Sequence, residues 1–332
     1  MKGHSTEAAV IKALKEKHGD CDYISGEDLA AQSSISRAAI WKHVKSLRQK
    51  GYEIEATPRR GYRLLSSPDA LLAEELFPLL ATTTFGRTIV YKDTIDSTNR
   101  YAKELAEKGA EEGTVVIANE QRRGKGRLDR RWVSPPGGIW LSIILRPAIP
   151  LQEASKFTLL AAVAAARAIE TAGLNPEIKW PNDILIGGKK VCGILLEISA
   201  QSDRIDYLVI GLGINANNDL DTIPIDSREH ATTLAAALGK KIDRRSLVAT
   251  LLLELENRSK TLLAGGWQEI LDEWMKRCRM FGRHIILRML HGEVEGEFVG
   301  VDQSGAIRIQ LPGGEIKSFA AGDVSVKKQR LT

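Results

Sequence analysis

The feature that most constrains the fold is a pair of helical segments near the N-terminus, separated by the turn "SSIS". Ser25 and Ser36 are each placed to cap a helix, because a serine hydroxyl accepts a hydrogen bond from an unpaired N–H group of the first turn. Gly51 is placed to end the second helix. The second helix carries a stripe of apolar residues at helical spacing, formed by Ile40, Val44 and Leu47. Two helices joined by a tight turn predict a helix-turn-helix.

A β-hairpin is predicted directly after these helices. Between Tyr52 and Leu65, apolar and charged residues alternate on the two sides of the turn "TPRRG". The second helix and this turn are both basic, and cations grouped in this way suit the phosphate backbone of DNA. The alternative is a helical bundle with a solvated charged face. The residues that we expect at the DNA are Ser36, Arg37, Lys42, His43, Lys45, Arg59 and Arg60.

The composition is that of a globular protein with roughly two or three domains. Hydrophobic residues make up 43% and charged residues 27% of the chain, which excludes wholesale disorder. The net charge of +5 permits an anionic partner without requiring one. The three cysteines form no C-x-x-C pair, which argues against a zinc site or a disulfide framework. The sequence has no signal peptide and no apolar run of about 18 residues, so we expect a cytoplasmic protein that does not enter a membrane.

The stretch "RRGKGRLDRRWVSPPGG", residues 122–138, predicts a flexible cationic loop. Its six basic residues face a single acid, Asp129. Gly124 and Gly126 allow the backbone to approach a ligand closely and to aim N–H groups at it. Apolar strands are predicted on both sides, at "TVVIANEQ" and "IWLSIILRP". Such a loop can hold a nucleic-acid backbone, a nucleotide phosphate or a protein partner.

Further polar residues lie at the ends of predicted elements in the same region. "DSTN", residues 96–99, begins a helix, where Asp96 or Ser97 is either an N-cap or a group that binds a small polar ligand. "KWPNDILIGGKKVCGILLE" predicts a strand, a turn and a hairpin with Lys190 on the return strand. The Ala-rich "SKFTLLAAVAAARAIETAG" predicts a buried helix. Core packing explains Trp132 and Trp180 as well as a ligand contact does.

Three known motifs are excluded by the sequence. No stretch fits the Walker P-loop, and no G-x-S-x-G elbow of a serine hydrolase is present. "GLGINA" resembles a dinucleotide-binding fingerprint, but "NNDLDTIPID" follows it and cannot begin a helix. What remains is a cationic glycine loop, a lysine on a neighbouring strand and an aspartate in a turn. That set suits the stabilisation of anions better than nucleophilic catalysis.

The last part of the chain predicts a small β domain. From residue 283 onward, short alternating strands are separated by turns at 291–292, 303–305 and 312–314. The pattern is typical of an SH3-like barrel, and it contains no evident catalytic cluster.

Taken together, these motifs resemble the bifunctional biotin protein ligases of the biotin operon repressor type. The resemblance rests on "DSTN", "EQRRGKGRLDRRWVSPPGG", "KWPNDILIGGKKVCGILLE" and "GLGINAN" in this order, after a winged helix-turn-helix, and it covers essentially the whole chain. The family's glycine loop usually reads G-R-G-R-x-G-R-x-W. Lys125 stands here for its first Arg, and Asp129 for its third Gly, which makes the loop stiffer and less cationic.

The resemblance implies an α+β multidomain fold. Residues 1–65 are expected to form the winged helix-turn-helix and residues 66–84 a linker. Residues 85–275 are expected to form a mixed-sheet, class II synthetase-like ligase domain, and residues 276–332 the SH3-like domain. The implied reaction joins biotin and ATP into biotinyl-5′-AMP and pyrophosphate, and then transfers biotin to a lysine of the biotin carboxyl carrier protein. Mg²⁺ is implied to enter with the ATP phosphates, so that no metal is tightly bound.

Site residues follow from the resemblance position by position. Ser97, Thr98, Asn99 and Gln121 match residues that bind the ureido head of biotin. Lys125, Gly126 and Arg127 match the loop over biotin and its adenylate, and Lys190 matches the lysine that meets the carboxyl and phosphate oxygens; Arg127, Lys190 and Asp183 are therefore the candidate catalytic residues. The candidate nucleotide-binding residues are Trp132, Asn182, Gly124 and Arg130, and Asp183 is also the candidate Mg²⁺ ligand.

The resemblance also implies the partners. These are the carrier protein, operator DNA and a second copy of the chain, with biotinyl-5′-AMP as the corepressor that promotes the homodimer. Two alternatives stay open on the residues alone. One is a ligand-sensing repressor without ligase activity, and the other is a lipoate or octanoate transferase of related fold.

Overall fold

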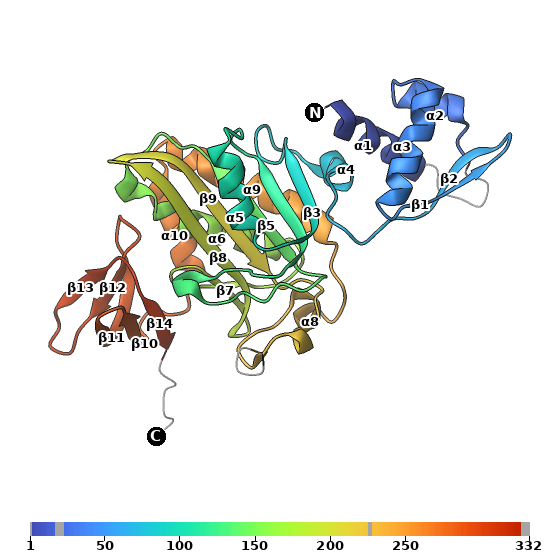
Figure 1. Cartoon of the computed structure of the whole chain (residues 1–332). Helices are drawn as coiled ribbons and strands as arrows, with labels where there is room; N and C mark the ends of the chain where they lie inside the picture. The colour runs from blue at the N-terminus through green and yellow to red at the C-terminus, as the bar shows by residue number, and fades with distance from the viewer. Residues whose placement is uncertain (1, 17–22, 225–227, 327–332) are drawn as a thin grey trace.

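The computed structural model describes residues 2–16, 23–224 and 228–326. Three domains follow one another along the chain, with the first and the last at opposite ends of the central one (Figure 1). The first consists of three helices and a hairpin: α1 (Lys2–Lys15), α2 (Gly26–Gln32), α3 (Arg37–Gln49), β1 (Glu53–Thr57) and β2 (Gly61–Ser66).

Both predicted helix caps of the first domain are confirmed. The Ser25 hydroxyl accepts from Asp28 N at 3.0 Å, and the Ser36 hydroxyl accepts from Ala39 N at 3.3 Å. Strands β1 and β2 pair antiparallel, as the alternating pattern predicts. The stripe Ile40, Val44 and Leu47 is buried against α1 and the hairpin. The winged helix-turn-helix is therefore confirmed.

The central domain is built on a seven-stranded mixed sheet of order β3-β4-β5-β9-β8-β7-β6. Only the β3–β4 pair is parallel among the pairings of this sheet in the described residues. The strands are β3 (Ile89–Ile95), β4 (Val115–Gln121), β5 (Ile139–Leu145), β6 (Glu177–Lys179), β7 (Asp183–Ile186), β8 (Lys189–Gln201) and β9 (Arg204–Ile214).

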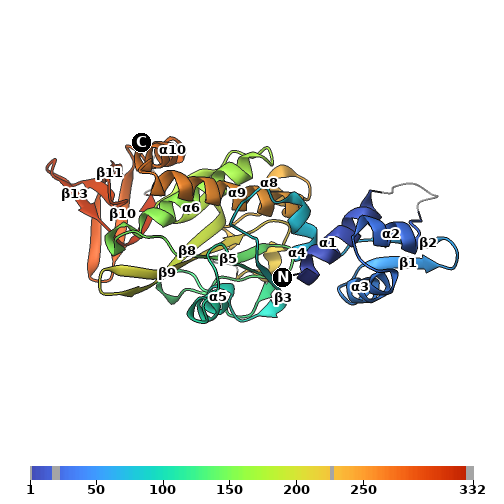
Figure 2. The same cartoon turned by 90° about the horizontal axis from the view of Figure 1, so that it is seen from above.

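Helices cover both faces of this sheet. One face carries α5 (Thr98–Glu107), and the other carries α6 (Lys156–Glu170), α9 (Arg244–Leu263) and α10 (Trp267–Arg277), as Figure 2 shows from above. The predicted Ala-rich helix is α6. It is apolar nearly all round because it lies between the sheet and the outer helix α9. Strand β5 is buried along its whole length for the same reason, since helices cover it on both sides.

Shorter helices fill the connections. Helices α4 (Ala73–Leu76) and η1 (Phe77–Leu79) lie in the predicted linker, and Leu71, Ala73 and Leu76 belong to the central core. The remaining short helices are η2 (Arg127–Asp129), η3 (Leu151–Glu153), η4 (Leu220–Thr222) and α8 (Leu234–Leu238). No helix in the described ranges combines the length and the apolar character that crossing a bilayer requires.

The segment that carries α4 is tied to both of its neighbouring domains by buried charges. Glu75 of α4 is almost fully buried, accepts from Tyr52 Oη at 2.7 Å on the winged-helix side, and pairs with Arg245 of α9 at 2.9 Å. Arg244, also buried, donates to Asp69 O and to Gly138 O, where β5 begins. The segment between the domains is thus packed on both sides.

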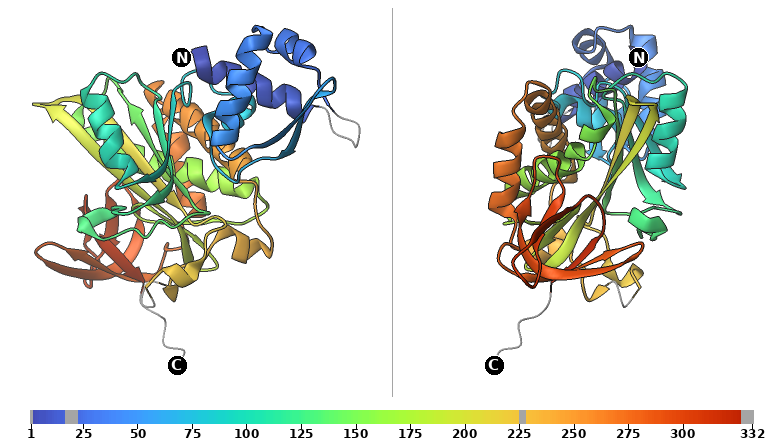
Figure 3. Two further views of the ribbon diagram at one scale, coloured as in Figure 1. Left: turned by 45° about the vertical axis from the view of Figure 1, so that its right-hand side comes forward. Right: turned by 90° about the vertical axis from the view of Figure 1, so that its left-hand side faces the viewer.

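The last domain is a five-stranded antiparallel sheet of order β13-β12-β11-β10-β14, at the end of the molecule away from the winged helix (Figure 3). Its strands are β10 (His284–Met289), β11 (Gly292–Val301), β12 (Ile307–Gln310), β13 (Ile316–Phe319) and β14 (Asp323–Val326). Its core is continuous with that of the central domain, and Trp180 Nε1 donates to Gly305 O at 3.0 Å across the boundary. Trp180 is therefore a packing residue. The three-part α+β fold class is confirmed.

Candidate active site

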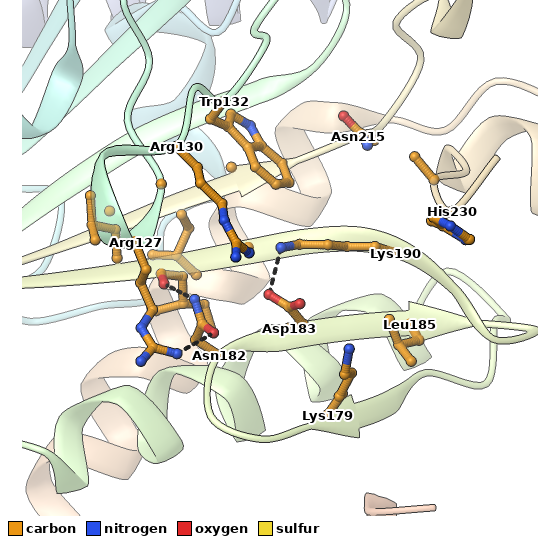
Figure 4. A pocket seen from close by; sticks show the side chains of 18 of the residues that line it. Arg127, Arg130, Trp132, Lys179, Asn182, Asp183, Leu185, Lys190, Asn215 and His230 are labelled. Atoms are coloured by element: carbon orange, nitrogen blue, oxygen red, sulfur yellow. Dashed lines mark hydrogen bonds and ion pairs between the residues drawn. The ribbon is translucent and has the colours of Figure 1, made fainter. Parts of the chain in front are cut away.

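A cavity of about 920 Å³ lies over β8 and β9, beneath the glycine loop and beside the last domain. Figure 4 shows how its side chains converge from the loop, from the β6–β7 turn and from β8. Every ligand-contacting candidate from the sequence lines it except Gly124. The residues brought together are Ser97, Thr98, Asn99, Gln121, Lys125, Gly126, Arg127, Arg130, Trp132, Asn182, Asp183 and Lys190.

One end of the cavity is neutral and polar. It is formed by the first turn of α5, where Thr98 and Asn99 are both almost fully buried. Thr98 N donates to Gln121 Oε1 at 2.8 Å, and the Gln121 amide nitrogen donates to Ser134 Oγ at 2.8 Å. The Ser97 hydroxyl caps α5, as one of the two sequence interpretations predicts. Ser97 also lies on the cavity wall. Uncharged groups fixed in this way suit a neutral ligand head with its own donors and acceptors.

Glycines form the floor of the cavity, and the sequence did not mark them as site residues. Gly211 and Gly213 alternate on β9, so both face the cavity. A methyl group at Gly211 would stand 2.7 Å from Asn99 Cγ, and one at Gly213 would stand 2.8 Å from Trp132 Cε2. The side chains above need the space that these glycines leave. The sequence does contain a pattern that indicates this floor: in "GLGIN" glycine recurs at every second residue, the spacing of side chains on one face of a strand.

The glycine loop closes on itself. Trp132 N donates to Gly124 O at 2.8 Å, and Gly126 N donates to Arg130 O at 2.7 Å. Between these bonds Leu128 takes left-handed backbone angles (φ 54°), and its side chain is exposed. A methyl group at Gly124 would collide with Trp132 O and stand 2.8 Å from Ser134 Oγ. Gly124 thus lets the loop fold tightly and does not line the cavity. The side chain of Asp129 lies outside what the structure describes.

Trp132 lies flat over the floor of the cavity. Its ring stands against Gly193 and Gly213, and the Lys190 ammonium is 5.0 Å from the ring centroid. Its buried indole N–H meets no hydrogen-bond acceptor in the described parts of the chain. An aromatic face beside a cavity with an unused donor is suited to a planar ligand ring that carries an acceptor.

Cations crowd the other end of the cavity. Lys190 Nζ lies 2.6 Å from Asp183 Oδ1, and Arg130 pairs with Asp323 at 2.6 Å. Arg127 contacts Asn182 Oδ1 at 3.4 Å and Asp323 at 3.7 Å. Figure 4 shows the Lys190, Arg130 and Arg127 head groups turned toward this end. Two carboxylates face more cations than they can neutralise, so the site is arranged for a further anion.

Burial and neighbouring charges also lower the pKa of two basic groups at this end of the cavity. Burial is the main cause that lowers the pKa of Lys179, and Lys190 and Arg130 nearby lower it further, against the attraction of Asp183. Burial also lowers the pKa of Arg127, and Asp323 and Asp183 partly offset this effect. An anion placed here would remove the repulsion among these cations.

The last domain contributes to the site, although its sequence gave no sign of this. Asp323, Ser325 and Val326 of β14 line the cavity. Arg127 donates to Gly322 O at 3.2 Å across a separation of 195 residues. Sequence patterns report local periodicity, so a contact at this separation leaves no signal in them. A smaller cavity of about 170 Å³ adjoins the first, and Arg288 of β10 lines it together with Lys179 and Asp323.

Carboxylates at the cationic end of the cavity are the candidate groups for holding a metal ion. Within the described ranges, no three His, Cys, Asp or Glu side chains are grouped so that they could hold a metal ion. Asp183 and Asp323 are the aspartates on the cavity wall. A Mg²⁺ ion commonly takes one or two carboxylates and completes its shell with substrate phosphates and water. The donor set fits that mode.

The second candidate surface lies on the winged helix. Ser36, Arg37, Lys42 and Lys45 of this surface are exposed on or beside α3, and Arg59 and Arg60 are exposed at the hairpin turn. His43 differs, because it is half-buried with Nδ1 3.8 Å from Glu7 of α1. Trp41, which the sequence did not mark, is 59% exposed on α3 with the Lys45 ammonium 5.5 Å from its ring centroid.

Comparison with known proteins assigns each domain to a family. Residues 7–63 match an HTH domain, residues 91–215 the biotin/lipoate A/B protein ligase family, and residues 280–327 the biotin protein ligase C terminal domain. The chain is 42% identical over 307 residues to the bifunctional ligase/repressor BirA of Bacillus spizizenii, with 92% of this chain and 94% of that protein covered. Its identity to the protein of the same name in Escherichia coli is 30% over 309 residues, with 92% and 94% covered.

A solved structure shares the fold of most of this chain. It is the biotin protein ligase from Aquifex aeolicus in complex with biotin and ATP, with a TM-score of 0.64 and 28% identity. The match covers 73% of this chain and 100% of that one.

Proposed function

This chain belongs to the family of bifunctional biotin ligases and biotin operon repressors, and we propose that it biotinylates a carrier protein and represses biotin genes. The observation that carries the proposal is one cavity with two unlike ends. Neutral donors and acceptors around Thr98 and Gln121 suit the ureido head of biotin, and the cations around Lys190 suit a carboxylate beside a polyphosphate.

The first step forms a mixed anhydride. An oxygen of the biotin carboxylate attacks the α-phosphorus of ATP, the P–O bond to the β-phosphate breaks, and pyrophosphate leaves. Two anions must meet in this step, so fixed positive charge lowers the barrier. Lys190 and Arg127 are proposed to supply that charge, with Arg130 beside them. Asp183 is proposed to help hold Mg²⁺, which neutralises phosphate charge when it is bound with ATP.

The second step transfers biotin. The amine of a carrier lysine attacks the acyl carbon of biotinyl-5′-AMP, AMP leaves with the electron pair of the C–O bond, and the nitrogen loses a proton. Because an acyl phosphate hydrolyses readily, the glycine loop is proposed to shield it from water. Lys125, Gly126 and Arg127 are the loop residues on the cavity wall that suit this role. The nucleotide is proposed to lie beside Trp132 and Asn182.

The regulatory half of the proposal concerns DNA. The exposed cations of α3 and of the hairpin turn are proposed to contact operator phosphates. Biotinyl-5′-AMP is proposed to favour a homodimer that spans two half-sites, which requires that it bind the dimer more tightly than the monomer. The domain boundaries 1–65, 66–84, 85–275 and 276–332 and a cytoplasmic location complete the proposal.

Pyrophosphate release by the full chain tests the enzymatic half. ATP and Mg²⁺ are supplied together with either biotin or lipoate. We expect pyrophosphate release in the reaction that contains biotin and none in the reaction that contains lipoate. Release with lipoate only would assign the chain to lipoate transfer. Calorimetric binding of biotin without any release would leave a ligand-sensing repressor instead.

A further inference from the structure

We infer that Trp41, on the exposed face of α3, recognises thymine in operator DNA through the 5-methyl group that thymine presents in the major groove. The inference rests on the proposed binding of operator DNA and goes beyond it, because it assigns base recognition to one side chain. The cations of this surface are proposed to contact phosphates, which carry no sequence information. Recognition of a particular operator needs a residue that meets the edges of the bases.

Trp41 is exposed on a helix that buries its other large apolar side chains. Ile40 and Val44 of α3 are buried in the core of the winged helix, whereas Trp41 beside them is 59% exposed. A single exposed apolar side chain does not identify a partner. The charges around the ring do.

The surroundings of the ring are cationic. Arg37, Trp41 and Lys45 follow one another at the four-residue spacing of one helix face, and all three are exposed. The Lys45 ammonium lies 5.5 Å from the ring centroid, so these two side chains lie side by side. The sequence of α3, RAAIWKHVKSLRQ, contains no acidic residue. A cationic face without an acid complements a polyanion, which favours DNA over an apolar protein surface as the occupant.

The position of Trp41 along α3 places it at the bases. Helix α3 is the second helix of the helix-turn-helix, and Trp41 is four residues after its first residue, Arg37. In this motif the N-terminal residues of the second helix contact base edges in the major groove. Ala38, one turn before Trp41 on the exposed face, is small and lets the helix approach the floor of the groove.

The indole edge matches thymine best among the four bases. It offers apolar carbons and one polar group, the Nε1–H donor, and it has no acceptor. Thymine presents a methyl group beside the O4 acceptor in the major groove, so both kinds of group on the indole find a partner. Guanine presents two acceptors without an apolar group, and the amino groups of adenine and cytosine are donors that an indole cannot satisfy.

Replacement of thymine by deoxyuridine tests the inference, because uracil lacks only the 5-methyl group. The operator is first selected from a random DNA pool by the full wild-type chain with biotinyl-5′-AMP. Each thymine is then replaced in turn, and the dissociation constant is measured by fluorescence anisotropy. For the wild type we expect a thymine in each half-site at which the replacement weakens binding about fourfold, the value of one buried CH₂ group.

Trp41→Ala connects this loss to the indole ring. The variant should bind the thymine operator more weakly by roughly tenfold or more, as expected for a lost base contact. The loss caused by deoxyuridine should disappear in it, because the ring and the methyl group act as one pair. The slope of log K against log salt should keep its wild-type value, since no charge is removed.

Two control variants separate this contact from its surroundings. Lys42→Ala removes a cation from the exposed surface of α3 and should keep the deoxyuridine effect. Leu65→Ala removes a large apolar side chain that is 54% exposed at the end of β2 away from the hairpin turn, and we expect wild-type affinity.

The possible outcomes are distinct. A wild-type protein that tolerates deoxyuridine at every thymine would refute the inference, and so would a Trp41→Ala protein that retains the full deoxyuridine loss. A selection that enriches no DNA sequence would refute the proposed operator binding instead.

Discussion

Replacement of Gly213 by alanine should displace Trp132 and weaken ATP binding. The added methyl group would collide with the indole Nε1 and stand 2.8 Å from Cε2 and 3.1 Å from Cδ1. Favourable contact between such atoms begins near about 3.5 Å, so the ring has to move by roughly 1 Å. The displaced ring no longer offers its face to the nucleotide that is proposed to lie beside it. The contact of one ring face covers about 100 Å², or roughly half of what a buried aromatic side chain covers.

This area sets the expected size of the effect. At ~25 cal/mol per Å² the lost contact is worth about 2.5 kcal/mol. If the whole of it is lost from the nucleotide complex, affinity falls by about 60-fold. The assay is calorimetry with a non-hydrolysable ATP analogue and, separately, with biotin. Biotin affinity should change much less, because its proposed head-group site lies at Thr98 and Gln121.

Matched variants show whether the effect runs through Trp132. Gly26→Ala is the control for the substitution itself, since a methyl group there meets Tyr62 at 3.5 Å, an ordinary contact. In a Trp132→Ala background the ring is gone, so adding Gly213→Ala should cost little more. An equal loss of ATP affinity from Gly213→Ala in both backgrounds would refute the steric argument.

Three further predictions concern other parts of the molecule. Lys190→Ala should slow pyrophosphate release by about 10²- to 10³-fold, the usual loss for one preorganised donor, while the protein still shifts operator DNA in a gel when biotinyl-5′-AMP is supplied; release at the wild-type rate would contradict its role. Lys45→Ala should weaken operator binding and reduce the slope of log K against log salt by about one, as expected for one lost phosphate contact; an unchanged slope would place Lys45 away from the DNA. Burial opposes ionisation of Glu256, but hydrogen bonds from Lys260, Phe85 N and Thr83 outweigh it and lower its pKa. Glu256→Gln should therefore cost about 2 kcal/mol of unfolding free energy in urea at pH 7, a difference that is full above the ordinary pKa of 4.5 and shrinks as the pH falls below it.

The N-terminal domain could be predicted from the sequence almost completely. Its two helix caps, its hairpin and its buried stripe all depend on residues close together in the chain. Local hydrogen bonds and periodic burial leave a direct trace in the order of residues, so local reasoning is sufficient. The alternation of buried strands and helices in the central domain could be predicted for the same reason.

The cavity was predictable only in part. Its ligand-contacting candidates came from motifs, and the structure brings all of them together except Gly124. Gly124 illustrates the limit, because a glycine beside cations can serve a ligand or a tight loop, and only the structure shows that a methyl group there would collide with Trp132 O. His43 is a similar case, since its position on α3 did not reveal that it faces Glu7.

The sequence by itself therefore determined the order of the domains, their local elements and the residue types that a biotin ligase requires. Only the tertiary structure decided that β14 carries Asp323 to the glycine loop, that glycines of β9 make room for Asn99 and Trp132, and that Asn99 donates to Glu197. The physical reason is distance along the chain. Local backbone preferences act over a few residues, whereas steric fit and the direction of a hydrogen bond depend on which distant groups the folded sheet places within a few ångströms of one another.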